Sequence, residues 1–262
     1  FHDGTPFNAA AVKYNFDRQI AINDPRGSAP YFNLNFVGAA EYAAGDKTQA
    51  NLSTYLSKNA VEVIDEFTVA IHIKAQNAIF PYMLITSAGL IVSPSWIESH
   101  GGVVPGERND ELGLQGSQAG TGPFVLKSWD VGTQTAVLVR NDDYWGSPYN
   151  EGPAKLKNVL IRVLRDTGTR ILNIKTGVSD LTFVNQDLLN EVLDLDLWLN
   201  EGVIKSTAAG VKINGPYPML SVRYIGFNNN IVDEEGNSLE SQPFQNDKIR
   251  EAMGYAFDYE TF

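Results

Sequence analysis

The chain has three histidines, His2, His72 and His100. Histidines that share a metal ion usually stand at a spacing that lets both rings reach it, as in the H-E-x-x-H pattern. No two of these histidines have such a spacing, and His72 lies in an alternating stretch typical of a strand. The histidines therefore indicate neither a metal site nor a catalytic base, and His72 is expected to face solvent.

Two glycine-containing loops carry patterns that other proteins use for chemistry. His100-Gly101-Gly102 is similar to the oxyanion loop of esterases, but an esterase also needs a G-x-S-x-G turn, and Ser117 does not have that spacing. Gly120-Thr121-Gly122-Pro123-Phe124 leads into a strand pattern, so no helix N-terminus would face a phosphate there. We expect this loop to be a tight structural turn into a central strand, with Phe124 buried.

The carboxylates and aromatic rings offer little specific chemistry by themselves. Asp194 with Asp196, and the acidic run 233–235, have no neighbours that would separate their pKa values, so a solvated helix end and a solvated turn are expected. The chain has 13 Phe, 11 Tyr and 4 Trp. Clusters at 31–32, 144–145 and 224–227 predict core packing, or the amphipathic walls of a cleft for a sugar or peptide.

Composition excludes several classes of protein. The chain has 262 residues, with 20 Lys and Arg against 31 Asp and Glu, for a net charge of −11. A net negative surface gains nothing from phosphate attraction, so nucleic-acid binding is not expected. Cysteine is absent, which removes disulfides, thiolate metal sites and cysteine nucleophiles. No apolar run approaches the roughly 18 residues of a membrane span, and both ends suggest a piece of a longer protein.

The first half of the chain reads as helical with one hairpin. Val12, Phe16 and Ile20 form one apolar helix face, and Ser93 before Pro94 is a typical helix start. Further expectations are a hairpin over 61–73, a short buried helix over 78–86 and a strand over 90–92. The glycine-rich stretch 101–122 is the best candidate for a domain border.

The second half alternates strands with helices, which favours a mixed α/β fold. A final helix carries Ile249, Met253 and Phe257 on one face. This apolar stripe is expected to pack against the chain itself or a second copy. The predicted strands are 124–129, 135–140, 159–164, 181–184, 203–206 and 221–228, and the predicted helices are 166–176, ending at Gly177, and 186–199.

Six sequence blocks, in order along nearly the whole chain, resemble the peptide/nickel class of ABC-transporter solute-binding proteins, family 5. The blocks are Phe1 to Val12, which resembles F-H-D-G-x-P-[FL]-x-A-x-D-V with Ala11 in place of the acidic residue; the hairpin at 61–69; Gly120 to Phe124; Arg140 to Gly146; Tyr224 to Asn228; and Ile249 to Asp258.

The resemblance implies a periplasmic-binding-protein-like class II lobe with an inserted accessory domain, truncated at both ends. Residues 1–118 would be the accessory domain beside the N-terminal lobe. Residues 119–220 would be the central part of that lobe, and residues 221–262 the crossing into the C-terminal lobe. Such receptors close two lobes on a ligand about a hinge.

The resemblance also implies a function and a site. The chain would belong to an extracytoplasmic receptor, periplasmic or on the outer face of the membrane, that captures a peptide or similar small solute and delivers it to an ABC permease. It would need no cofactor or metal, would not be an enzyme, and would meet the membrane only through a lipid anchor or the permease. The implied ligand-binding residues are Tyr31, Phe183, Asn185, Tyr224 and Gly226.

Other classes of protein stay open at this point. The aromatic clusters and His100-Gly101-Gly102 also suit a secreted hydrolase of glycans or esters, and a sensor or chaperone could reuse the receptor fold. The ligand could be a peptide, a nickel complex or a sugar. Because capture needs both lobes, the chain alone is expected to bind peptides weakly or not at all.

Overall fold

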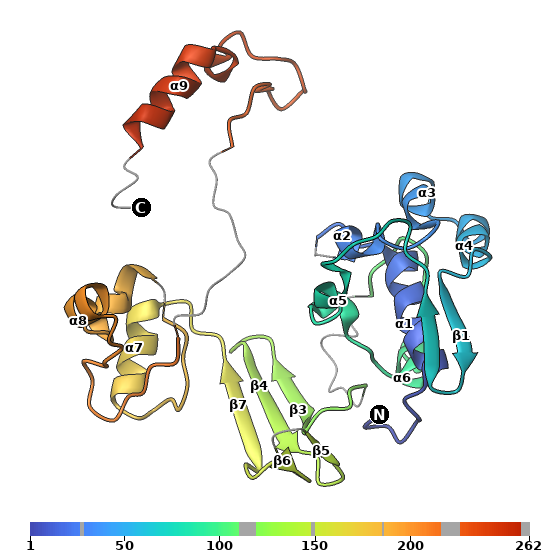
Figure 1. The fold of residues 1–262 in the computed structure, drawn as a ribbon, viewed down its shortest axis with the longest axis horizontal. Coiled ribbons are helices and arrows are strands. Elements are labelled where there is room, and N and C mark those ends of the chain that lie inside the picture. Colours follow the sequence, from blue (N-terminus) through green and yellow to red (C-terminus); the bar gives the residue numbers. More distant parts are fainter. Residues whose placement is uncertain (27–28, 110–118, 148–149, 185, 216–225, 258–262) are drawn as a thin grey trace. The chain divides into compact units, whose positions relative to one another are not determined.

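A computed structural model describes residues 1–26, 29–109, 119–147, 150–184, 186–215 and 226–257. The chain divides into two compact units, Phe1–Arg170 and Ile171–Phe262. Figure 1 shows helices at the start of the first unit, a sheet at its end, and helices with long loops in the second unit. The fold is therefore mixed α and β, as the alternating pattern predicted.

Residues 1–109 form a helical region around α1 (Ala9–Ile22). Asn8 caps its start by accepting from the Ala11 N–H, and Asn23 ends it in the left-handed conformation at φ 45°. The predicted apolar face is confirmed, because Phe16 and Ile20 are buried and Val12 packs against the same core. The other elements of this region are α2 (Ala29–Asn33), α3 (Ala39–Ala44), α4 (Gln49–Leu56), β1 (Val61–Asp65), β2 (Thr68–Ile71), α5 (Phe80–Met83), the 3-10 helix η1 (Ser87–Gly89) and α6 (Pro94–Ser99).

Four phenylalanine rings form the centre of the helical region. Phe36, which is 0% exposed, has its ring centroid 5.7 Å from that of Phe16, 5.2 Å from that of Phe32 and 5.8 Å from that of Phe80. Phe32 and Phe80 stack with an angle of 11° between their planes. Buried rings of this kind contribute more than their area alone, so α1, α2 and α5 share one core.

The expected hairpin is confirmed as antiparallel β1 and β2. Val61 pairs with Ile71, and the register shifts between Val63 and Asp65. Val61 is buried, and both strands pack against α1. Beyond the hairpin, Phe36 and Ile73 form a bridge that ties it to the end of α2.

A three-stranded antiparallel sheet completes the first unit, in the order β3 (Phe124–Asp130), β4 (Thr135–Arg140), β7 (Asn158–Arg162). These strands confirm the three predicted from the alternation, and a bulge between Leu126 and Ser128 shifts the first pairing. The small hairpin of β5 (Gly146–Ser147) and β6 (Asn150–Glu151) lies between β4 and β7 in the sequence. The expectation of a buried Phe124 in a central strand was wrong. Phe124 is only half-buried, and β3 is an edge strand among the described residues.

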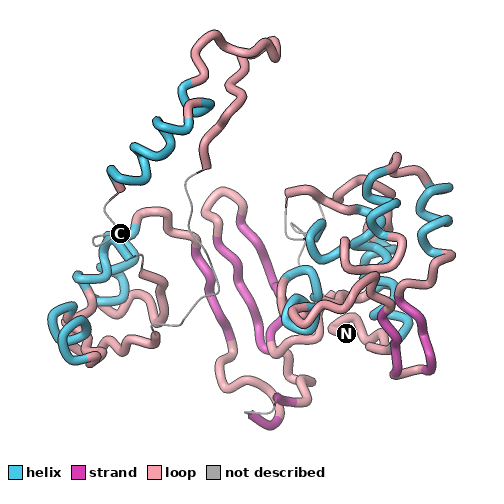
Figure 2. Tube along the Cα trace, turned by 45° about the horizontal axis from the view of Figure 1, so that its top comes forward, coloured by secondary structure: helices cyan, strands magenta, loops and turns pink. Residues whose placement is uncertain are grey.

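The second unit consists of short elements joined by long loops, which are drawn in pink in Figure 2. The predicted helix ending at Gly177 is confirmed as α7, and Gly177 has φ 73°. The elements after β7 in the sequence are α7 (Thr167–Lys175), the 3-10 helix η3 (Gln186–Glu191), α8 (Leu195–Glu201), the 3-10 helix η4 (Pro243–Gln245) and α9 (Asp247–Ala256).

Two expectations for the helical region were wrong, the first only in part. The stretch 78–86 does contain a short helix, α5, but it is not buried as a whole: Phe80 is buried, whereas Tyr82 and the flanking Ile79 and Ile85 are exposed. Residues 90–92 form no strand, because the Asn15 side chain takes the backbone groups of Val92. Its Nδ2 donates to the Val92 carbonyl at 2.8 Å and its Oδ1 accepts from the Val92 N–H at 3.1 Å.

More expectations failed in the second unit. Residues 181–184 form no strand, and the predicted strand 203–206 is a single bridge between Leu193 and Ser206. The predicted helix 186–199 is two elements, because Asp194 caps a new helix by accepting from the Leu197 N–H.

The remaining expectations concern the end of the chain. Most of the predicted strand 221–228 lies outside the described residues, and residues 226–228 are not a strand. On α9, Ile249 and Met253 are exposed, whereas Phe257 at the end of the expected stripe is half-buried. The packing of this stripe against a second copy stays a prediction.

Candidate ligand-binding site

The side chain of Tyr31 is exposed, whereas the backbone around it is held by hydrogen bonds and by a buried neighbour. It is 75% exposed, whereas the next residue, Phe32, is 1% exposed and stacks on Phe80. The Asn35 amide donates to the Tyr31 carbonyl at 3.1 Å and to the Phe32 carbonyl at 3.0 Å. The sequence places Tyr31 in α2, and the buried ring beside it fixes the helix, so the tyrosine ring is free to meet another surface.

The helix α5 shows the same arrangement beside α2. Asn77, just before α5, donates from Nδ2 to the Asn35 Oδ1 at 2.7 Å, which links the two elements. Around the buried Phe80, the neighbours Ile79, Tyr82 and Ile85 are exposed. Tyr31, Ile79, Tyr82 and Ile85 are called the α2–α5 surface below. Exposed apolar side chains beside a buried core are suited to binding rather than to stabilising this region.

The other expected site residues belong to the second unit. Phe183 is 82% exposed in a segment without regular structure, and Gly226 is exposed. Asn185 and Tyr224 lie outside the described residues. Tyr31 belongs to the first unit. The common role of these five residues stays a prediction.

His2 contacts the loop that the sequence analysis treated as a structural turn. Its backbone N–H donates to the Gly120 carbonyl at 2.8 Å, and its Nε2 donates to the Gly122 carbonyl at 2.8 Å. One residue further on, the Pro123 carbonyl accepts from the Asn141 N–H at 2.9 Å. The first and third of the six sequence blocks therefore meet in space, and Asn141 of the fourth block joins them.

Asp3 collects donors beside His2. Its Oδ1 accepts from the Thr5 N–H at 2.9 Å and from the Thr5 hydroxyl at 2.5 Å, and its Oδ2 accepts from the Ser93 hydroxyl. Burial raises the pKa of this carboxyl, but the hydrogen bonds from Ser93 and Thr5 outweigh it, so the pKa of Asp3 lies below its ordinary value. Sequence reasoning identified Ser93 only as a helix cap and gave Asp3 no role, although both the F-H-D-G block and the cap were visible.

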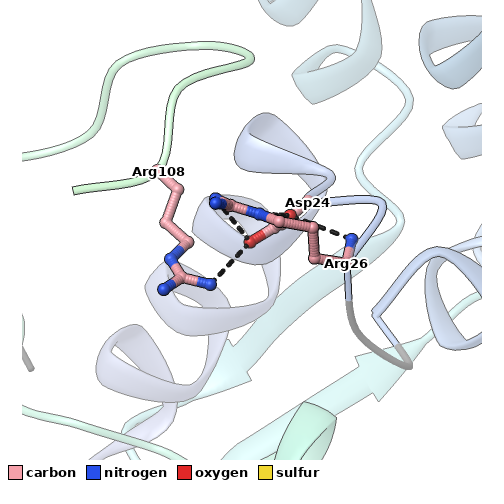
Figure 3. Close-up of polar contacts among 3 residues, drawn as sticks. All are labelled: Asp24, Arg26 and Arg108. Carbon is pink, nitrogen blue, oxygen red and sulfur yellow. Dashed lines mark hydrogen bonds and ion pairs between the residues drawn. The ribbon is translucent and has the colours of Figure 1, made fainter. Parts of the chain in front are cut away.

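The most conspicuous charged cluster, Asp24 with Arg26 and Arg108, holds the chain together. Figure 3 shows both guanidinium groups turned toward the Asp24 carboxylate. Arg26 Nε donates to Oδ1 at 3.0 Å and Arg108 Nη1 donates to Oδ2 at 3.2 Å. The hydrogen bonds from Arg26 and then Arg108 hold the pKa of the Asp24 carboxyl well below its usual range. Both arginines make further contacts, so this cluster ties residue 108 to the end of α1.

The other histidines have ordinary surroundings. His72 Nε2 lies 3.0 Å from Glu62 Oε2 on the exposed hairpin. His100 stacks on Trp96 at 4.1 Å, and its Nδ1 lies 2.7 Å from the Trp96 carbonyl and 3.0 Å from Ser99 Oγ. Ser99 donates to that same carbonyl, so these contacts close the end of α6. Among the described residues, no group of three or more His, Asp or Glu side chains could hold a metal ion, and no helix is long and apolar enough to cross a membrane.

The whole chain, residues 1–262, matches the model of the bacterial extracellular solute-binding proteins, family 5, middle region. The chain therefore belongs to this family, as the six blocks predicted. The family is extracellular, which agrees with the expected extracytoplasmic location.

Curated relatives match nearly the whole chain. The glutathione-binding protein GsiB of Escherichia coli (strain K12) is 27% identical over 262 residues, which cover 98% of this chain and 38% of the relative. GsiB of Shigella boydii gives the same identity and coverage. The chain thus spans less than half the length of these relatives. They are binding proteins rather than enzymes, so the expectation that the chain is not an enzyme is confirmed and the hydrolase alternative is withdrawn.

Solved structures show the same fold. The substrate-binding domain of an oligopeptide ABC transporter from Bacillus anthracis str. Ames has a TM-score of 0.54 at 16% identity, over 76% of this chain and 34% of that one. The pheromone receptor PrgZ has a TM-score of 0.57 at 19% identity, over 99% and 43%. The Escherichia coli murein tripeptide binding protein MppA has a TM-score of 0.53 at 19% identity, over 76% of this chain and 35% of that one.

Proposed function

We propose that the chain is part of a receptor that captures a peptide or a similar small solute outside the cytoplasm and delivers it to the permease of an ABC importer. The observation that carries this proposal is the match of the whole chain to the family of extracellular solute-binding proteins. The 27% identical GsiB relatives, which bind glutathione, support a peptide-like ligand, since glutathione is itself a modified tripeptide.

The α2–α5 surface supports a role for Tyr31 in that capture. A tyrosine offers an apolar ring face and one hydroxyl, which suits a ligand that alternates apolar side chains with polar backbone. The ring is exposed while its backbone is held by Asn35 and by the buried Phe32. Because the backbone is already held, ligand binding would restrict only the rotation of the Tyr31 side chain, which keeps the entropy cost of binding small.

The first experiment titrates the full-length protein with glutathione and with trialanine in a calorimeter. Tyr31→Ala is expected to raise the Kd of whichever probe binds by about tenfold, a loss typical of an aromatic hot spot. Phe67→Ala is the matched control, because Phe67 is equally exposed, at 76%, but lies in the turn between β1 and β2. Equal affinity of Tyr31→Ala and wild type would remove Tyr31 from the site.

The second unit would supply the facing residues Phe183, Asn185, Tyr224 and Gly226. A glycine there leaves room for ligand backbone to approach. Gly226→Leu is therefore expected to weaken binding in the full-length protein without lowering its melting temperature. If the affinity measured by calorimetry is unchanged, Gly226 does not line the site.

Delivery to a permease separates an import receptor from a sensor or chaperone of the same fold. Liganded full-length protein is expected to be retained by its permease in detergent, and the chain of residues 1–262 alone is expected to bind neither probe tightly. A receptor that binds its ligand but associates with no permease would favour the sensor or chaperone.

A further inference from the structure

We infer that His2 and Asp3 are positioning residues. They fasten residues 8–109 of the helical region to the β3–β4–β7 sheet. Together with Thr5, Ser93, Gly120 and Gly122 they form what is called the polar joint below. Because Tyr31 lies in the helical region, the polar joint sets where that ring stands relative to the sheet. Only this last step rests on the proposed function.

The first half of the joint is the pair of hydrogen bonds from His2 to the segment directly before β3. A carbonyl only accepts hydrogen bonds, so the 2.8 Å contact with Gly122 requires the proton on Nε2. The ring also lies against Gly120, where an added Cβ would be 3.4 Å from the His2 Cε1. With the backbone bond to the Gly120 carbonyl, His2 holds this chain at two carbonyls separated by one residue.

The second half of the joint is the Asp3 carboxylate. The hydroxyl protons of Thr5 and Ser93 both point to it, which leaves the oxygen of Ser93 to accept from the Trp96 N–H at 3.1 Å. Ser93 is completely buried, and its own N–H donates to the Ala119 carbonyl at 2.8 Å. The carboxylate therefore links the turn at residues 1–5 to the start of α6 and, through Ser93, to the chain that enters the sheet.

The joint matters because the helices and the sheet share little packing in the part of the chain that the structure describes. Among the described residues, the helices of residues 8–109 make no extensive contact with β3, β4 or β7. Asn141 lies immediately after β4, and its N–H donates to the Pro123 carbonyl, so the segment that His2 binds is also attached to the sheet. The half-buried Asp3 carboxylate accepts from three donors, whereas an Asn in its place would offer one acceptor oxygen instead of two, so Asp3→Asn weakens these contacts.

The experiment measures the distance between two spin labels in the unliganded full-length protein, in a background free of other cysteines. Labels at Gln49→Cys on α4 and Val131→Cys in the turn between β3 and β4 report on the two parts. Both positions are exposed. Wild type is expected to give one narrow distance distribution, and Asp3→Asn and His2→Ala are each expected to broaden it. Circular dichroism establishes that each variant is folded, and His2→Ala carries the test if Asp3→Asn is not.

The matched control is Asn33→Ala, which removes a buried hydrogen-bonding side chain from the same helical region. Its Nδ2 donates to the Gln19 carbonyl and to the Asn23 Oδ1, neither of which belongs to the joint. It is expected to lower the melting temperature and leave the distribution narrow. Unchanged distributions in folded His2→Ala and Asp3→Asn would overturn the inference. Equal broadening by Asn33→Ala would also overturn it, since the effect would then follow stability. Because the distance measurement uses no ligand, it tests the joint even if the binding experiments contradict the proposed function.

Discussion

The helical region of residues 1–109 and the second unit, residues 171–262, are both built from short helices, yet only the first has a sizeable core. In the helical region, Phe16, Phe32, Phe36 and Phe80 are buried together. In the second unit, the buried apolar residues among those described are Ile171, Val192 and Leu193, while Phe183 and Tyr255 are more than four-fifths exposed.

The difference teaches that local signals make helices in both regions but do not make a core. Thr48 caps α4 and Asp194 caps α8 with the same geometry, a side-chain oxygen 3.2 Å from the N–H three residues on. Helices this short are marginal in water without packing. The α4 helix buries Leu52 and Tyr55, whereas α8 buries no side chain. Among its described residues, the second unit therefore has capped helices but little core to hold them.

The largest expected effect comes from removing the central ring of the helical region. Phe36→Ala should cost about 3–5 kcal/mol, because it opens a cavity among three other rings. The exposed Phe183→Ala should cost less than about 0.5 kcal/mol. Amide hydrogen exchange of α1 and α7 measures both. Comparable losses from the two variants would end the contrast between the regions.

A smaller effect is expected from the matched helix caps. Thr48→Ala and Asp194→Ala should each cost about 0.5–2 kcal/mol locally. The amides of α4 should stay protected because Leu52 and Tyr55 hold that helix, whereas those of α8 should exchange almost freely. Hydrogen exchange followed by mass spectrometry resolves the two helices. Equal loss of protection would mean that packing does not distinguish them.

The smallest expected effect concerns acid. The pKa of Asp3 is lowered from 3.8 in the folded state, so its contribution to stability is present above its unfolded pKa and is lost as pH falls through the folded pKa. The melting temperature of Asp3→Asn should lie below that of wild type at about pH 6, and the gap should narrow as the pH falls below the ordinary value of 3.8. A gap independent of pH would mean that the charge of Asp3 does not stabilise the joint.

The acid effect also has a counterpart in the second unit. The Asn237 N–H donates to Asp233, which lowers the pKa of that carboxyl, but Asp233 lies in a turn between exposed neighbours, where solvent screens its charge. Asp233→Asn is therefore expected to leave the melting temperature unchanged at every pH. A shift as large as that of Asp3→Asn would show that exposed turns contribute as much as the joint.

The sequence was most informative where one local pattern decides the structure. The apolar face of α1, the hairpin at 61–71 and the cap at Ser93 all follow from residues close together in the chain. The sheet strands were predicted for the same reason. The family, and with it the fold, followed from six blocks whose order carries more information than any one of them.

The rest depends on contacts between distant residues, which spacing does not encode. Val92 forms no strand because Asn15, far away in sequence, takes its backbone groups. The helix 186–199 is interrupted where Asp194 caps a new helix and its N–H bonds to Lys205. The candidate site was predictable only from the family resemblance. No local pattern distinguishes the exposed Tyr31 from the buried Phe32 beside it.

The bond between His2 and Gly120 also bears on how such a chain can change its length. It brings the two ends of the segment 3–119 within one hydrogen bond of each other, so the segment leaves and rejoins the rest of the chain at a single point. A short turn could bridge that point at a small entropic cost. Deletion or exchange of the segment in a gene would then leave the strands of the sheet in register, and a lineage could resize this part without rebuilding the rest.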